Sequence, residues 1–263
     1  MKFSCLSSGS KANCTFVAGS KSALLVDVGL SSRQVELRLA RIGARPEQLH
    51  AILVTHEHSD HIAGLAAFSR KHRIPVFANQ GAAPFVSQSY HVEIFDSAVG
   101  FEIDGISVTP VPVQHDAQEP VGFVLQEGAI RLGVVTDLGR ITPVIRQALS
   151  GVNGVVLESN HDQELLQICN YPWHLKQRIA STHGHLSNDS AAAFLGQIAH
   201  QALSHIVLAH LSENSNTPRH ALRTAAGHLD RWSGEICCAS VAVPTGLADL
   251  YLAREEGLGQ NAA

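Results

Sequence analysis

The sequence has few charged residues and no long hydrophobic run. Of its 263 residues only 16% are charged while 45% are hydrophobic, so the chain can bury a sizeable core. No apolar run approaches the roughly 18 residues that a membrane-spanning helix needs, and positions 1–5 lack the apolar stretch of a secretory signal. We therefore expect a cytoplasmic protein with no membrane segment.

Cysteines are also few. The chain has five, an odd number, and none forms a CxxC pair. Cys237 and Cys238 are adjacent in a predicted strand, where successive side chains point to opposite faces, which argues against a local disulfide. We expect five free thiols, in keeping with a cytoplasmic location.

The sequence also lacks an excess of positive charge: 19 lysines and arginines against 23 aspartates and glutamates give a formal net charge of −4. A nucleic-acid partner would therefore need a local basic strip. The modest candidates are Arg33, Arg38, Arg41 and Arg45, then Arg70, Lys71 and Arg73, then Lys176 and Arg178. Tyr171, Trp173 and His174 could stack on a terminal base, although packing is the commoner use of such residues.

What the sequence has is a dense group of metal-binding side chains at residues 55–61, THEHSDH. The group follows the apolar run 51–54, so His56 and His58 leave a strand end as an i, i+2 pair that can reach one ion. Asp60 and His61 then open a helix predicted over Ile62–Arg70, which turns them toward a neighbouring ion. A polar loop rich in histidine is the alternative. The spacing predicts half of a two-metal site.

Four more polar residues each stand just after a predicted strand. They are Asp27 after 23–26, His115 after 111–113, Asp137 after 132–135 and His210 after 205–209. Taken singly, each is more often a structural cap than a ligand. Their order along the chain makes them candidates for the rest of the site.

This order resembles the metallo-β-lactamase superfamily, whose pattern is an early aspartate, HxHxDH, a lone histidine, a lone aspartate and a final histidine, each at a strand end. Four segments are similar to the narrower YycJ/WalJ-type proteins, which are regarded as bacterial metal-dependent DNA exonucleases. They are 7–14 (SSGSKANC), 158–162 (ESNHD), 184–188 (GHLSN) and 210–216 (HLSENSN). Ala12 stands where that group usually has glycine, a departure that touches no metal ligand.

The resemblance implies an α/β fold, an αββα sandwich of two mixed β-sheets flanked by helices, whereas periodicity alone predicts only α/β. We expect one metallo-β-lactamase-like domain over residues 1–254 and a flexible C-terminal tail over 255–263. The predicted helices are Arg33–Ile42, Ile62–Arg70, Pro143–Leu149, Ser187–His200 and Pro218–Trp232.

The resemblance also implies a ligand set for two divalent ions. Metal 1 would take His56, His58 and His115, metal 2 would take Asp60, His61 and His210, Asp137 would bridge the two, and Asp27 would support them from behind. Nitrogen and oxygen donors without thiolate suit zinc, which we favour, then manganese, and also iron.

The expected chemistry is hydrolysis by a hydroxide that bridges the two metals. Such a site suits attack on phosphorus or on a carbonyl, but a phosphodiester expels a poor alkoxide that benefits from a general acid. The phosphodiesterase branch of the superfamily uses a histidine in a motif similar to GHLSN, so His185 is our candidate acid. Glu158 and Asp60 complete the expected catalytic set. The alternative for His185 is a segment that caps the helix after Ser187.

Three other residues are weaker candidates. Ser10 and Asn13, in the loop 7–13, could contact a phosphate, although a plain hairpin explains that loop equally well. His161, with Asp162, either supports the site from behind or simply precedes a helix. His183 is expected to be structural or solvent-facing.

The preferred hypothesis is a phosphodiesterase that acts on DNA ends from 5′ to 3′. A small-molecule hydrolase of the same fold, for a cyclic phosphodiester, a thioester or a lactam, is the alternative, and a protein without enzymatic activity is a third. The sequence leaves the metal, the strand preference and the oligomeric state open.

Overall fold

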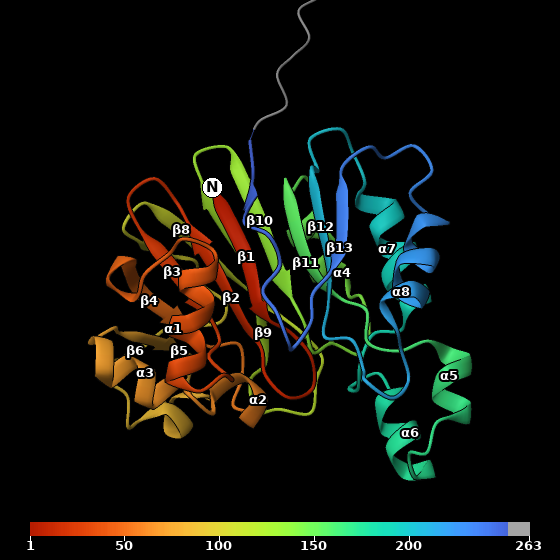
Figure 1. Ribbon diagram of the computed structural model, residues 1–263, viewed down its shortest axis with the longest axis horizontal. Helices are drawn as coiled ribbons and strands as arrows, with labels where there is room; N and C mark the ends of the chain where they lie inside the picture. Colours follow the sequence, from red (N-terminus) through yellow and green to blue (C-terminus); the bar gives the residue numbers. More distant parts are fainter. Residues whose placement is uncertain (252–263) are drawn as a thin grey trace, which may run out of the picture.

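The computed structural model describes residues 1–251, which form two seven-stranded mixed β-sheets packed face to face with helices on both outer faces (Figure 1). The expected αββα sandwich is confirmed. The predicted boundary at residue 254 and the predicted tail 255–263 lie outside the described residues.

The first sheet has the strand order β14-β1-β2-β3-β4-β5-β6. Its strands are β1 (Lys2–Ser7), β2 (Cys14–Ala18), β3 (Ala23–Val26), β4 (Leu49–Leu53), β5 (Val76–Ala78), β6 (Val92–Ile94) and β14 (Ala248–Asp249). The pairs from β14 to β3 are antiparallel, and those from β3 to β6 are parallel.

The second sheet has the strand order β13-β12-β11-β10-β9-β8-β7. Its strands are β7 (Phe101–Ile103), β8 (Ile106–Pro112), β9 (Val121–Glu127), β10 (Ile130–Val135), β11 (Gly154–Glu158), β12 (His205–Ala209) and β13 (Glu235–Cys238). The pairs from β7 to β10 are antiparallel, and those from β10 to β13 are parallel. Each sheet therefore has a parallel half.

The helices cover the outer faces of the sheets. They are α1 (Ser32–Arg41), α2 (Ser59–Ile62), α3 (Leu65–His72), α4 (Pro143–Leu149), α5 (Gln163–Ile168), α6 (Trp173–Ile179), α7 (Asn188–Ile198) and α8 (Pro218–Ala226), with short 3-10 turns η1 (Pro46–Gln48) and η2 (Ala83–Val86). Helices α1 and α3 pack on the first sheet, and α4, α7 and α8 pack on the second. Helices α5 and α6 extend beyond the sandwich at the lower right of Figure 1.

Apolar residues on alternate sides of the strands build three core layers. On β11, Val156 faces the layer between the sheets, while Val155 and Leu157 face the layer under the helices. A strand that is buried on both faces needs an apolar run, which Val155, Val156 and Leu157 supply before Glu158 ends the strand. The strand is thereby fixed on both sides, which holds its C-terminal end in place.

The helix predicted over Ile62–Arg70 is confirmed from Leu65 onward, where α3 lies, but Ile62 belongs to a separate short helix, α2, with a break at Gly64. The break follows from close packing: a Cβ on Gly64 would lie 1.7 Å from the carbonyl oxygen of Leu30. The amide of Gly64 also donates to the carbonyl oxygen of Val28 at 3.0 Å. The contacts of Gly64 with Leu30 and Val28 therefore interrupt the helix between Ile62 and Leu65.

Other elements differ in extent or were not predicted. Helix α8 ends at Ala226 and not at Trp232, because Gly227 is its C-cap. Helix α6 was not predicted, and α5 was anticipated only as one alternative for the segment after Asp162. Trp173 on α6 is 63% exposed. The expectation that its side chain packs in the protein interior is therefore wrong. In the first basic strip, Arg38 is buried and donates to the carbonyl oxygen of Leu6 at 2.7 Å, so it offers no surface charge.

The expectations about disulfides and about membrane-spanning helices can be checked in residues 1–251. All five cysteines are free thiols, as predicted. In this part of the chain no helix combines the length and the apolar composition needed to cross a bilayer.

Candidate metal centre

The candidate site lies where the carboxyl ends of parallel strands from both sheets meet. Asp27 follows β3 and His56 follows β4 in the first sheet. Asp137 follows β10, Glu158 ends β11 and His210 follows β12 in the second. Ligands of α/β sheets typically bind outside the carboxyl ends of the strands. The strand-end residues found in the sequence are therefore brought together by the two parallel halves.

Three of these residues have a left-handed backbone. Asp27, Asp137 and His210 have φ values of 61°, 55° and 54°. Aspartate and histidine adopt this conformation more often than most residues with a side chain, but it still costs of order 1–3 kcal/mol. Such strain persists where the surrounding structure enforces it, and it clusters at functional sites.

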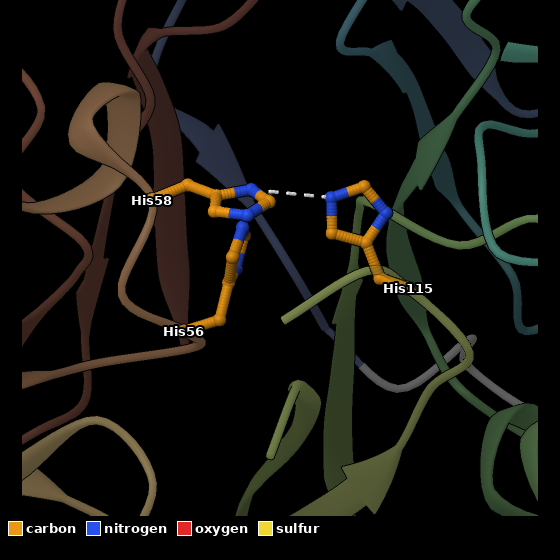
Figure 2. A group of neighbouring side chains, drawn as sticks. All are labelled: His56, His58 and His115. Atoms are coloured by element: carbon orange, nitrogen blue, oxygen red, sulfur yellow. Dashed lines mark hydrogen bonds between the residues drawn. The ribbon is translucent and has the colours of Figure 1, made fainter. Parts of the chain in front are cut away.

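Three histidines form the first half of the site. His56 and His58 follow β4 in one sheet, and His115 faces them from beyond β8 in the other (Figure 2). His58 Nδ1 lies 3.3 Å from His115 Nε2, and the three residues offer nitrogens within 4.8 Å of one another. His56 Nε2 is buried without a hydrogen-bond partner. A buried polar atom without a partner is uncommon, and a shared cation would satisfy this one.

Asp60, His61 and His210 form the second half, again with donor atoms within 4.8 Å of one another. Asp60 Oδ2 lies 3.3 Å from His61 Nε2 and 3.4 Å from His210 Nε2. His61 and His210 are buried. This set mixes imidazole and carboxylate donors, which suits the borderline divalent cations.

Asp137 stands between the two halves. Its Oδ1 lies 3.8 Å from His115 Nε2 on one side and 3.4 Å from His210 Nε2 on the other. Its Oδ2 lies 3.1 Å from His61 Nε2 but makes no hydrogen bond. A buried carboxylate oxygen that faces a ring nitrogen without a hydrogen bond fits a shared cation better than a proton.

The charge states follow from burial and from this crowding. Burial holds the pKa of His56 well below its usual value, so the ring is neutral. Burial opposes ionisation of Asp137, but the positive charges of His210 and His61 hold its pKa well below the usual range. For His210, burial is outweighed by Asp137, Asp60 and Glu158, which raise its pKa to about 10. The ionised carboxylates thus give the site a negative potential that attracts cations.

Asp27 supports this centre from behind. It is buried, its Oδ1 accepts from the backbone N–H of Thr55 at 2.9 Å, and its Oδ2 accepts from Thr55 Oγ1 at 2.7 Å. The same Oδ2 lies 2.7 Å from His61 Nδ1. A carboxylate on one ring nitrogen fixes the tautomer and directs the other nitrogen toward a metal.

His185 and Glu158 form a pair beside Asp137. His185 Nδ1 lies 2.8 Å from Glu158 Oε1, and Glu158 Oε2 accepts from the backbone N–H groups of Leu138 and Leu186 at 3.0 and 3.1 Å. Burial opposes ionisation of Glu158, but the charge of His185 and the hydrogen bonds from His185 and His210 lower its pKa to about 2. Glu158 is therefore ionised, and the Nε2 atom of His185 is left for another partner.

The segment that contains His185 also caps helix α7, and this capping leaves the Nε2 atom of His185 available. Ser187 is the N-cap of α7 and accepts from the backbone N–H of Ser190 at 3.2 Å. The capping alternative is thus correct for Ser187, while His185 itself binds Glu158. Gly184 permits this arrangement, because a Cβ there would lie 2.1 Å from the carbonyl oxygen of Arg178.

The weaker candidates fall in different places. Asn13 is buried, and its Nδ2 lies 3.0 Å from Asp60 Oδ2 and 3.0 Å from His61 Nε2, so it contacts the ligands themselves. Ser10 is exposed on the β1–β2 hairpin. His183 is exposed, as expected, and Asp162 caps α5.

A buried amide network behind the site was not predicted. Asn160 Nδ2 donates to the carbonyl oxygen of His210 at 2.8 Å. Asn216 Nδ2 donates to the carbonyl oxygens of Ser159 and Asn160 at 2.8 and 3.0 Å, and Asn188 pairs with Asn216. These residues tie together the loops after β11 and β12 and the start of α7. The signal for them was their place in the segments 158–162, 184–188 and 210–216.

We expect that His56→Ala and His115→Ala each lower the metal content of the purified protein from two ions per chain to one or fewer. Both residues supply nitrogens to the same cluster, and metal affinity falls steeply when one ligand is removed. Elemental analysis of the dialysed protein measures this, with His183→Ala as the matched control. Full metal content in both variants would contradict the assignment.

The sequence is similar to known proteins over most of its length. A family model described as a beta-lactamase superfamily domain matches residues 23–210. The chain is 36% identical over 226 residues to Exodeoxyribonuclease YycJ of Bacillus anthracis, a match that covers 82% of this chain and 84% of that protein. It is 34% identical over 236 residues to Exodeoxyribonuclease WalJ of Streptococcus pneumoniae, covering 87% of this chain and 88% of that protein.

The fold also matches solved structures. The metallo-beta-lactamase fold protein YhfI from Bacillus subtilis aligns with a TM-score of 0.68 at 15% identity, covering 93% of this chain and 98% of that one. At this level of identity the likeness shows the fold alone.

Proposed function

This chain belongs to the metallo-β-lactamase superfamily, and from that premise we propose that it is a metal-dependent DNA exonuclease. Relatives that share about a third of their residues with it over most of both chains are named exodeoxyribonucleases, which supports DNA as the substrate. The proposed 5′ to 3′ direction rests on the resemblance to the YycJ/WalJ type. Five free thiols favour a cytoplasmic location.

The residues fit two divalent cations. His56, His58 and His115 would hold one, Asp60, His61 and His210 the other, and Asp137 lies between them. When bound, the two cations would lower the pKa of water, provide hydroxide near neutral pH and stabilise negative charge on a phosphoryl group. We propose zinc as the metal, then manganese, then iron, because the donors are nitrogen and oxygen without thiolate.

The observation that carries the proposal is the His185–Glu158 pair. Hydrolysis of a phosphodiester joins the oxygen of water to phosphorus and breaks the bond from phosphorus to a sugar oxygen, which leaves as a poor alkoxide. With Nδ1–H donated to Glu158, His185 can give the proton on Nε2 to that oxygen. The attacking water loses one proton to solvent, and His185 regains one from solvent after the leaving oxygen has departed, so the protons balance. A thioester or lactam hydrolase would have little use for this acid.

In residues 1–251, two side chains of the expected basic strips already bind carboxylates. Arg178 on α6 binds Asp116, with Nε 2.6 Å from Asp116 Oδ2, and Lys71 binds Glu36 at 2.7 Å. With a net charge of −4, the protein depends on the bound cations for much of its attraction to phosphate. We therefore expect DNA affinity to fall when the metals are removed.

A panel of substrates tests the proposal. The metal-loaded protein is given duplex DNA, bis(p-nitrophenyl) phosphate, a cyclic nucleotide, a thioester and a lactam, and initial rates are compared. We expect turnover of DNA and of the activated phosphodiester. Robust turnover of the thioester or the lactam with none on DNA would favour a small-molecule hydrolase instead.

A further inference from the structure

A cavity of about 290 Å³ opens beside His185, at the lower end of the size range of ligand pockets. Its walls come from four segments: the loop after β10, the loop after β11 with α5, the end of α6, and the loop before α7 with the first turn of that helix. The residues that matter for the argument are His161, Gln163, Gln167, His185, Ser187 and Ser190. Because His185 belongs to both, the cavity adjoins the candidate metal centre.

His161 is the unexplained residue in this wall. Its side chain is buried, with 3% of the residue exposed, and its Nδ1 has no hydrogen-bond partner. Burial lowers the pKa of His161, so the ring is neutral and offers one donor and one acceptor. Its backbone is fixed, because the N–H of Asn188 donates to the His161 carbonyl oxygen at 2.8 Å. A fixed, buried imidazole without a partner points to a ligand.

The chemistry of the wall indicates the class of ligand. Among residues 1–251 no lysine, arginine, aspartate or glutamate lines the cavity, so it is poorly suited to a phosphate group. Gln163 and Gln167 supply amides that both donate and accept, and Leu166 and Ala180 supply an apolar surface. Neutral hydrogen-bonding groups beside an apolar surface match a nucleoside, whose base has a polar edge and an apolar face.

We propose that this cavity is the subsite for the nucleoside whose sugar oxygen leaves during hydrolysis, and that His161 binds that nucleoside. The inference rests on the proposed function and deepens it. In the proposed reaction His185 gives its proton to the leaving oxygen, so the nucleoside attached to that oxygen lies next to His185, and the cavity that His185 lines offers the space for it. For attack from the 5′ end this is the terminal nucleoside, and α5 with the end of α6 bounds its position.

Two neighbouring residues on α5 provide a matched test. Gln163 lines the cavity and Glu164 does not, although both are exposed. We expect Gln163→Trp, which fills the cavity, to lower kcat/KM on duplex DNA by more than about tenfold through steric exclusion. His161→Ala should lower it about tenfold, as expected for one lost hydrogen bond, and His161→Gln should restore part of the loss. Glu164→Trp should behave as wild type.

Two further readouts separate a subsite from a structural role. Turnover of bis(p-nitrophenyl) phosphate, which carries no nucleoside, should stay within twofold of wild type in every variant, about the precision of a rate comparison. Inhibition by deoxythymidine 5′-monophosphate should weaken in Gln163→Trp and His161→Ala. Wild-type rates on DNA for both variants, or equal losses on both substrates, would overturn the subsite while leaving the nuclease intact. A wild-type protein inactive on DNA would remove the proposed function and the subsite together.

Discussion

Asp137→Asn is expected to lower kcat on DNA by more than roughly 10⁴-fold, because a two-metal centre accounts for much of the 10⁶-fold or greater acceleration typical of enzymes. The carboxylate is buried, with its two oxygens 3.1 to 3.8 Å from ring nitrogens of His61, His115 and His210. Asparagine has the same size but replaces one carboxylate oxygen with an NH₂ group, which cannot bind a cation. This group would also direct a hydrogen-bond donor toward the proposed cation positions.

The measurement is the steady-state rate on duplex DNA, with elemental analysis of the same sample. Far-ultraviolet circular dichroism serves as the control for folding, since the substitution preserves side-chain volume. A variant that keeps a tenth of the wild-type rate would rule out Asp137 as the residue that joins the two halves of the site.

His185→Ala is expected to lower kcat on DNA by about 10²–10⁴-fold, the usual contribution of a general acid, while both metals remain bound. The residue contacts Glu158 at 2.8 Å through Nδ1 and is not among the seven residues assigned to hold the cations. Bis(p-nitrophenyl) phosphate should lose less than about tenfold, because p-nitrophenolate leaves readily without a proton. The selective loss on DNA is the signature of an acid.

His183→Ala is the matched control for this variant, because it removes an exposed histidine two positions away. Its rates should equal those of wild type on both substrates. Equal rates of wild type and His185→Ala on DNA would refute the role of His185. An equal loss on DNA and on the activated ester would indicate that His185 only positions the centre.

The site could be anticipated because strand ends are readable in a sequence. The apolar runs before Asp27, His56, Asp137 and His210 predicted strands, and the structure has β3, β4, β10 and β12 in those places. Nothing local says that the first two strands lie in one sheet and the last two in another. The resemblance predicted two mixed sheets but not which strand lies in which, and the structure supplies that arrangement, which decides which ligands can share an ion.

The left-handed backbone at Asp27, Asp137 and His210 was not predicted, because local propensity disfavours it in residues with a side chain. It is imposed by the loops that join strand to helix. The break at Gly64 has a similar origin, since it depends on contact with Leu30, more than 30 positions earlier in the chain. Long-range contacts of this kind override helical periodicity.

Helix α6 was missed, and α5 was only an alternative, because both are short. Each spans only six or seven residues, too few for helical periodicity to stand out. Consequently the cavity beside His185 was invisible in the sequence, and His161 could be assigned only two general roles, as a support or as the residue before a helix. The structure places it in the wall of that cavity.

The most direct test of the account is a time course on duplex DNA labelled at one 5′ end, with zinc or manganese supplied and Asp137→Asn run in parallel. The account predicts release of labelled mononucleotide from the first time point by wild type alone, and none after chelation of the metal. Intact DNA in the presence of fully metal-loaded wild-type protein would contradict it.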